Sequence, residues 1–165
     1  MASSFRSVST RYRSGRRVGG ARHDPYKLDG KRAGRACCSR CGAVYHSGRW
    51  SWRERPRDAI TVECPACRRI HDRYPAGVLR LEGDFGPRRD ELAGLVRNVE
   101  EREKSQHPLE RLMSIRTERG VLVIETTGMH LARRIADAIR RTFHREAELQ
   151  FQQGEDFVRV LWRAG

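Results

Sequence analysis

The stretches that decide the fold are CSRCG at residues 38–42 and CPAC at residues 64–67. Each stretch places two thiols three residues apart, and the gap between the pairs is close to the ~15–20 residues typical of zinc sites. Gly42 permits the tight turn after the first pair. Two such turns can close a tetrahedral shell of four thiolates at about 2.3 Å from the ion. We therefore predict a structural Zn²⁺, because four protein thiolates leave no open position for a substrate; its ligands are Cys38, Cys41, Cys64 and Cys67.

Other uses of the cysteines are open but weaker. Five cysteines, an odd number in a chain without a secretory signal, favour a reducing compartment over disulfides. A redox site at residues 64–67 would leave the first pair unexplained. Cys37 is the spare cysteine, with a poorer spacing to Cys41 than Cys38 has. His46 and His71 are nearby substitutes, although a surface or phosphate-facing position suits them better.

Charge is concentrated before and around the cysteines. The chain has 165 residues and a net charge of +13, and residues 1–35 hold ten basic and two acidic side chains. Almost all the cations are arginines, whose planar forks pair with phosphate. Codon bias in a GC-rich genome explains part of the arginine excess but not the net charge. A polyanion is therefore the expected partner.

Residues 1–35 have glycine interruptions and no apolar periodicity, so we predict a basic tail that is disordered when free and orders on a nucleic acid. Its Ser- and Arg-rich start is also similar to mitochondrial presequences. Residues 36–76 should form a four-cysteine zinc-binding module, called here the knuckle module. The candidate RNA-binding residues in both segments are Arg11, Arg13, Arg16, Arg17, Arg22, Tyr26, Lys27, Lys31, Arg32, Arg35, Arg49, Trp50, Trp52, Arg53, Arg68 and Arg69.

The two tryptophans of the knuckle module allow two interpretations. Aromatic faces stack on unpaired bases, so Trp50 and Trp52 could bind RNA. A module of about 40 residues also needs a core, which the same rings could supply. The sequence leaves both roles open. One tryptophan could pack in the core while the other is exposed.

Residues 77–165 predict an α+β domain. A helix from Arg88 to Gln106 has an apolar stripe at i, i+3, i+4 and i+7, and a second helix follows Thr127, the expected N-cap. Around them we expect strands at residues 78–81, 111–117, 121–126, 147–151 and 157–162. The order β-α-β-β-α-β-β indicates an antiparallel sheet with helices on one face, close to a ferredoxin-like order.

The sequence contains no catalytic constellation, so we expect a protein that is not an enzyme. It has no phosphate-binding loop and no nucleophile elbow. No run of about 18 apolar residues is present either, so no membrane association is expected and the predicted location is the cytoplasm.

Several motifs together resemble one protein family: DPYKL (24–28), CSRCGAVYHSGRW (38–50), CPACRRIHDRYPAG (64–77), RNVEEREKSQHPLERL (97–112) and TTGMHLARRI (126–135). The chain resembles, over about residues 22–163, the bacterial NMD-type family, which is labelled as affecting ribosome stability and mRNA decay. The cysteine-rich part of that family is similar to the archaeal and eukaryotic large-subunit export adaptor. The resemblance implies a connection with the ribosome or RNA.

The leading hypothesis is a ribosome-associated, zinc-containing RNA-binding protein. It would act through rRNA contacts as an assembly, quality-control or dormancy (hibernation) factor, with a ribosomal protein as a further partner. The alternative is a zinc-ribbon DNA-binding regulator, although no recognition helix is evident next to the cysteines. A redox or metal-relay protein built on the two pairs is the third hypothesis.

Overall fold

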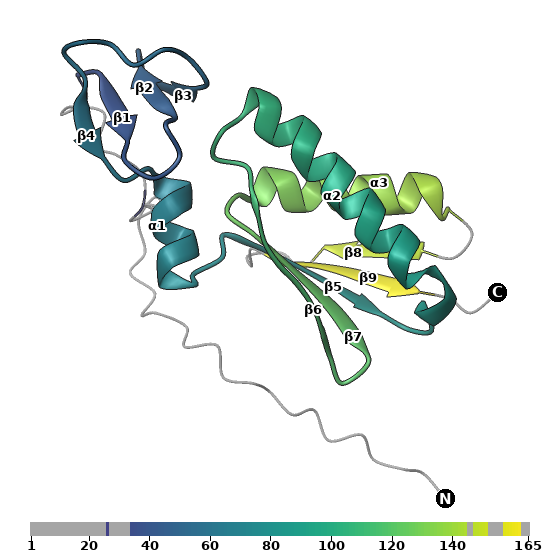
Figure 1. Ribbon diagram of the computed structural model, residues 1–165. Coiled ribbons are helices and arrows are strands. Elements are labelled where there is room, and N and C mark those ends of the chain that lie inside the picture. Colours follow the sequence, from purple (N-terminus) through teal and green to yellow (C-terminus); the bar gives the residue numbers. More distant parts are fainter. Residues whose placement is uncertain (1–25, 27–33, 145–146, 152–156, 163–165) are drawn as a thin grey trace, which may run out of the picture.

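The computed structural model describes Tyr26 and residues 34–144, 147–151 and 157–162. The described chain forms two mixed sheets and three α-helices, which confirms the α+β class (Figure 1). The elements are β1 (Ala36–Cys38), β2 (Val44–His46), β3 (Arg49–Ser51), β4 (Ile60–Val62), α1 (Pro65–Asp72), β5 (Gly77–Glu82), the 3₁₀ turn η1 (Gly86–Arg88), α2 (Arg89–Gln106), β6 (Leu112–Glu118), β7 (Val121–Thr126), α3 (Met129–Thr142), β8 (Ala147–Phe151) and β9 (Phe157–Trp162).

The knuckle module contains a small sheet with the strand order β3-β2-β1-β4. Strands β2 and β3 form a hairpin whose two turn residues, Ser47 and Gly48, have φ angles of 49° and 79°. Two positive φ angles are what the favoured two-residue hairpin turn requires. Strand β4 lies parallel to β1, which brings the chain back to the first cysteine pair just before the second begins.

Helix α1 lies next to the cysteines, where the sequence made no recognition helix evident. It begins inside the second pair, with Cys64 as N-cap and Pro65 in the first turn, where a missing N–H costs nothing. It ends at Arg73, which adopts a left-handed conformation with φ 51°. The helix is eight residues long, four of them apolar, which is too short for the repeated apolar period that identifies longer helices.

The sheet of the α+β domain has the order β6-β7-β5-β9-β8. It is mixed and not purely antiparallel as predicted, because β5 and β9 run parallel. Helix α3 leads from β7 to the edge strand β8, and β9 then returns between β8 and β5. The chain order of the elements is the predicted one, and β9 is the addition to a ferredoxin-like arrangement.

Helices α2 and α3 cover one face of this sheet (Figure 1). Leu79 and Ile124 of the sheet pack in one fully buried cluster with Leu92 of α2 and with Leu131 and Ile135 of α3. These are the apolar stripes that the sequence pattern places on the two helices. The core of this domain is therefore made almost entirely of aliphatic and aromatic side chains.

Thr127 is not the N-cap of α3, contrary to the prediction. The cap is Gly128, and the Thr127 hydroxyl instead donates to the Leu109 carbonyl over 2.5 Å. A carboxylate from another loop serves the helix end: Glu110 Oε2 accepts from the backbone N–H of Leu131 over 2.8 Å. A capping acceptor supplied by tertiary structure has no signature in the local sequence.

Within the described residues, no helix combines the length and the apolar character needed to span a bilayer.

Candidate metal centre

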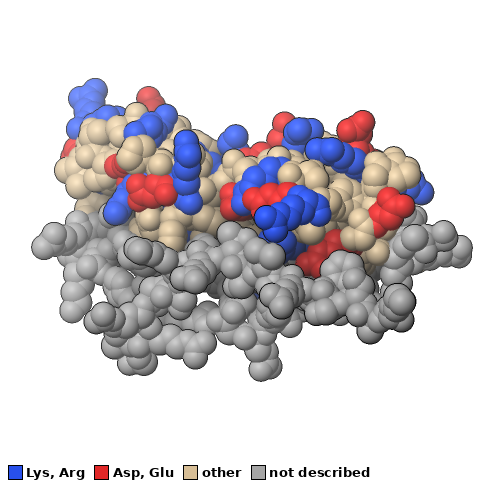
Figure 2. All heavy atoms as spheres, turned by 90° about the horizontal axis from the view of Figure 1, so that it is seen from below, with Lys and Arg blue, Asp and Glu red and all other residues tan. Residues whose placement is uncertain are grey.

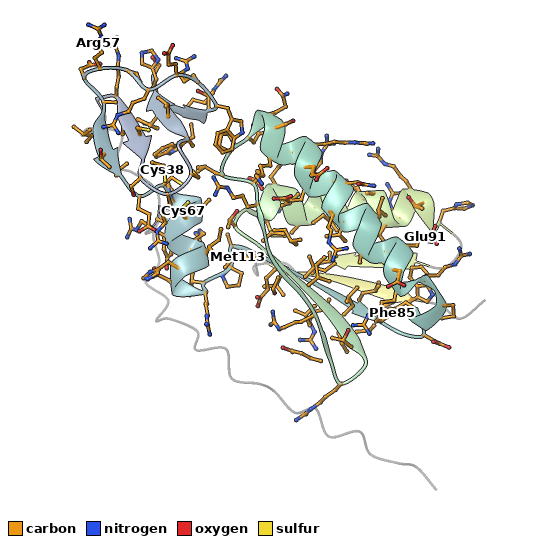
Figure 3. The ribbon with its side chains drawn as sticks, viewed as in Figure 1. Cys38, Arg57, Cys67, Phe85, Glu91 and Met113 are labelled. Carbon is orange, nitrogen blue, oxygen red and sulfur yellow. The ribbon has the colours of Figure 1, made fainter. Side chains whose placement is uncertain are left out.

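Four cysteine side chains converge where the first cysteine turn meets the start of α1. The Sγ atoms of Cys38, Cys41, Cys64 and Cys67 all lie within 4.8 Å of one another. Cys38 and Cys67 have their sulfur atoms 3.8 Å apart, as do Cys41 and Cys64. Figure 3 shows Cys38 and Cys67 directed toward the same point from β1 and α1. The four cysteines are close enough to hold one metal ion.

The spacing fits a tetrahedral thiolate site. Ligands about 2.3 Å from a central ion stand about 3.8 Å apart along the edges of a tetrahedron. A disulfide would need the two sulfur atoms at about 2.05 Å, and all five cysteines are free thiols. The donor set and its size therefore suit Zn²⁺.

Local backbone structure places the thiols. Gly42 has φ +77° and donates its N–H to the Cys38 carbonyl over 3.0 Å, which closes the first turn. The backbone N–H of Cys64 points at Cys38 Sγ over 3.3 Å, and that of Cys67 at Cys64 Sγ over 3.4 Å. Backbone donors aimed at sulfur favour the thiolate, which is the form that binds metal.

The thiols differ in their pKa values. Burial tends to raise the pKa of Cys38, but N–H groups of Cys64, Cys41 and Arg40 outweigh it and lower the value to about 6. Burial raises the pKa of Cys67 to about 11 and that of Cys64 still further, reinforced by the charges of the neighbouring thiolates. A divalent cation would offset this mutual repulsion and hold all four groups as thiolates.

Arg111, which directly precedes β6, reaches this cluster from the α+β domain. Its Nη1 lies 3.5 Å from Cys67 Sγ, and its Nε donates to the Pro108 carbonyl over 2.7 Å. Burial tends to lower the pKa of Arg111, but the contact with Cys41 and the negative charges of the thiolates raise it overall. The sequence does not predict this role for Arg111, because nothing local signals a contact across 44 positions.

Cys37 and the two nearby histidines lie apart from the four-sulfur cluster. Cys37 is buried with Val44 and Ala59 in a separate small cluster, because successive residues of a strand point to opposite faces. His46 Nδ1 lies 3.1 Å from Ser47 Oγ, and His71 Nδ1 lies 3.1 Å from Asp72 Oδ1.

The two tryptophans have different environments. Trp50 is 8% exposed and packs against Tyr45, with ring centroids 5.5 Å apart, in the core of the knuckle module. Trp52 is 41% exposed, and its Nε1 donates to the Lys104 carbonyl of α2 over 2.6 Å. Trp50 therefore builds the module, while Trp52 contacts the α+β domain and keeps one part of its ring accessible.

Tyr26, within the predicted tail, lies on α1. Its ring stacks on Tyr74 at 5.8 Å, and its hydroxyl donates to Asp72 over 3.0 Å. The guanidinium of Arg69 lies 4.3 Å from the centre of the Tyr26 ring, and that of Arg68 lies at 5.4 Å. Three candidate RNA-binding residues thus contact one another, and Arg69 is buried.

The remaining candidates are partly described. Arg35 pairs with Asp58 at 3.1 Å, Arg53 Nη1 lies 3.3 Å from His46 Nδ1, and Arg49 is exposed. The other candidates lie outside the described residues: Arg11, Arg13, Arg16, Arg17, Arg22, Lys27, Lys31 and Arg32. On the face drawn in Figure 2, basic and acidic side chains alternate over the described part of the surface.

Comparison with family models, with curated proteins and with solved structures found no match for this chain. The resemblance to the NMD-type family therefore stays a prediction from the sequence motifs.

Proposed function

We propose that the protein is a zinc-containing RNA-binding protein of the cytoplasm that associates with the ribosome through rRNA. In this role it serves as an assembly, quality-control or dormancy factor and not as an enzyme. The proposal rests on a small module whose four thiolates suit a closed structural zinc site and whose surface carries arginines available to phosphate.

The observation that carries the proposal is a set of exposed arginines on the knuckle module. Arg49, Arg57 and Arg73 are exposed, and no carboxylate within the described residues forms an ion pair with any of them. Arg57 projects from the end of the module opposite α1 (Figure 3). Arginine pairs with phosphate through two parallel hydrogen bonds, and such contacts fix a protein on a nucleic-acid backbone.

The thiol geometry favours metal over the redox hypothesis. Sulfur–sulfur contacts of 3.8 Å join the two cysteine pairs crosswise, from Cys38 to Cys67 and from Cys41 to Cys64. An exchange-active C-x-x-C site needs only the two thiols of one pair, so it would leave these contacts between the pairs without a role. A closed four-thiolate shell gives the zinc a structural role.

The test is co-sedimentation of the zinc-loaded full chain with purified ribosomes and separated subunits across about 50–300 mM salt. We expect migration with one particle that persists at the higher salt. Loss from every particle as salt rises would contradict a specific docking site and leave only general attraction to phosphate.

Two variants that lower the net charge equally distinguish binding through the knuckle module from general attraction to a positive protein. The first variant replaces Arg49, Arg57 and Arg73 with glutamine; the second replaces the exposed Arg97, Arg102 and Arg133 of α2 and α3. We expect the first to weaken binding more than tenfold, and to reduce the salt slope by about one for each arginine that contacts phosphate. Equal weakening by both variants would contradict docking through the knuckle module.

Helix α1 favours a second candidate function, the zinc-module DNA-binding regulator. It stands directly after a cysteine pair and presents Arg68 to the surface. However, the Tyr26 ring lies against Arg68 and hydrogen-bonds Asp72, which occupies part of the exposed side of the helix. Binding to particular duplex DNA sequences that survives competitor RNA would favour this function over ribosome association.

A further inference from the structure

We propose that Arg111 is a positioning residue of the metal centre, so that metal binding in the knuckle module also fixes the α+β domain against it. The inference rests on the metal site of the proposed function but not on RNA binding.

The guanidinium of Arg111 is held between the two parts of the molecule. Nη1 lies 3.5 Å from Cys67 Sγ, Nε donates to the Pro108 carbonyl, and the group lies 5.8 Å from the centre of the Trp52 ring. Its Nη2 is buried and has no hydrogen-bond partner within the described residues. A guanidinium that loses its water on burial needs a compensating negative charge nearby.

The loaded metal centre would supply that charge. A divalent ion with four thiolates carries a net charge of −2, and the guanidinium offsets half of it. Hydrogen bonds from outside the ligand shell orient thiolate ligands and tune metal affinity. Within the described residues, Arg111 donates a hydrogen bond to a ligand sulfur, that of Cys67.

The contacts around Arg111 extend the junction. Trp52 Nε1 donates to the Lys104 carbonyl at the end of α2, and Leu109 packs against the core of the knuckle module. Residues 104–111 thus form a segment of the α+β domain that contacts the knuckle module through Lys104, Leu109 and Arg111. The same segment is tied to its own domain by the hydrogen bonds from Thr127 and Leu131. We expect this segment to loosen when the metal is removed, since Arg111 then loses the anion that it faces.

The junction between the two parts also forms a groove. Under the proposal, metal binding would control the shape of this groove. A groove of about 400 Å³ is lined by Arg49 and Trp50 of β3 and by His107, Pro108 and His130 of the α+β domain. Because both parts contribute to its walls, the groove requires them to be docked. The rings of His107 and His130 meet edge to face at 6.1 Å on the α+β side.

The experiment compares Arg111→Gln, Arg111→Lys and the control Arg116→Gln, whose arginine pairs with Glu125 on the same segment of sheet. Zinc affinity is measured by competition with a chromophoric chelator, and amide hydrogen exchange is followed at residues 104–112. We expect Arg111→Gln to bind one zinc with about 10–100-fold lower affinity and to exchange faster at residues 104–112. Arg111→Lys should recover part of the affinity, and Arg116→Gln should retain all of it.

A spectroscopic measurement distinguishes positioning from general destabilisation. With Co²⁺ as the probe in place of zinc, Arg111→Gln should shift the sulfur-to-cobalt charge-transfer band, because the hydrogen bond to a ligand sulfur is lost.

Zinc removal from the unaltered chain should speed amide hydrogen exchange at residues 104–112 while β5 and β7 stay protected. This measurement does not depend on the folding of any variant. Unchanged affinity in Arg111→Gln, an unshifted band, or equal exchange with and without zinc would each overturn the proposal. Failure of RNA binding would leave these results unaffected and would count against the proposed function alone.

Discussion

The knuckle module and the α+β domain have cores made of different residue types. In the α+β domain the described core is a cluster of thirteen buried residues, mostly leucine, isoleucine and valine on two helices and a sheet. In the knuckle module the larger cluster is built from small alanines, two aromatic rings and cysteines. A segment of about 40 residues buries too little apolar surface to fold without a metal or another crosslink. The α+β domain is therefore held by hydrophobic burial, while the knuckle module has four clustered thiols that could hold an ion as its crosslink.

The largest expected effect is therefore loss of a metal ligand. Cys41→Ser should abolish stoichiometric zinc binding and unfold the knuckle module, because structural zinc sites contribute about 10 kcal/mol or more to folding. The α+β domain should keep its helices. Zinc content and amide exchange at residues 36–74 and in β5 and β7 measure the two outcomes separately.

Cys37→Ser is the matched control for this prediction. Cys37 is adjacent to the ligand Cys38 and is more buried than Cys41, but it lies in a separate cluster. The variant should retain one equivalent of zinc. Zinc binding by Cys41→Ser with the affinity of the unaltered chain would show that the four cysteines do not act together.

A truncation in the core of the α+β domain should have the opposite result: the domain loses stability and zinc binding is kept. Leu79 of β5 is fully buried between the sheet and the helices. Leu79→Ala should destabilise the α+β domain by about 2–5 kcal/mol while zinc affinity stays close to its original value. Thermal unfolding followed by helix content measures the effect, with Val78→Ala, a half-buried neighbour on the opposite face, as control. Equal losses for the two variants would contradict the core described for this domain.

The smallest expected effect concerns the ion pairs between α2 and α3. Glu103 of α2 is buried and accepts from Arg134 Nε over 2.7 Å and from His130 Nε2 over 3.2 Å. Burial tends to raise the pKa of this carboxyl, but the hydrogen bond and charge of Arg134 outweigh it and lower the pKa below the usual 4.5. Its stabilisation should be complete above the unfolded pKa and lost as pH falls through the lower folded value.

Glu103→Gln should consequently destabilise the domain by about 1–2 kcal/mol at pH 7, a modest figure because Arg134 is half exposed. The difference from the unaltered chain should shrink as the pH drops below about 4.5. Denaturant unfolding at several pH values measures it, and the exposed Glu101→Gln provides the control. A difference that stays constant into acid would show that the charge of Glu103 does not stabilise the fold.

The sequence predicted the features that depend on local spacing. Cysteine pairs at fixed intervals identified the four clustered thiols. Apolar periodicity identified α2, α3 and the positions of the strands along the chain in the α+β domain. Three-residue strands and the polar helix α1 have too few residues to show a period. Their positions depend on the turns between cysteines and on packing against Tyr45 and Trp50.

The sequence did not indicate the contacts between distant segments. Nothing near Arg111 indicates that it reaches Cys67, and nothing near Glu110 indicates that it caps α3. The position of β9 between β5 and β8 also follows from the whole sheet and not from its own pattern, since parallel and antiparallel neighbours place similar demands on a buried strand. Such features require three-dimensional structure, because they join residues that the chain keeps far apart.

The parallel pairing of β5 with β9 has a consequence for the order of folding during synthesis. Val78 aligns with Phe157, so the two central strands are separated by about eighty residues, and closing such a loop carries an entropic cost that grows with its length. The cysteines, by contrast, all lie between residues 37 and 67, a short segment that leaves the ribosome before β5 and β9. A metal-bound knuckle can thus form on the nascent chain while β5 still lacks a neighbour on one side. During that interval β5 has an unpaired edge that is open to mispairing with other strands.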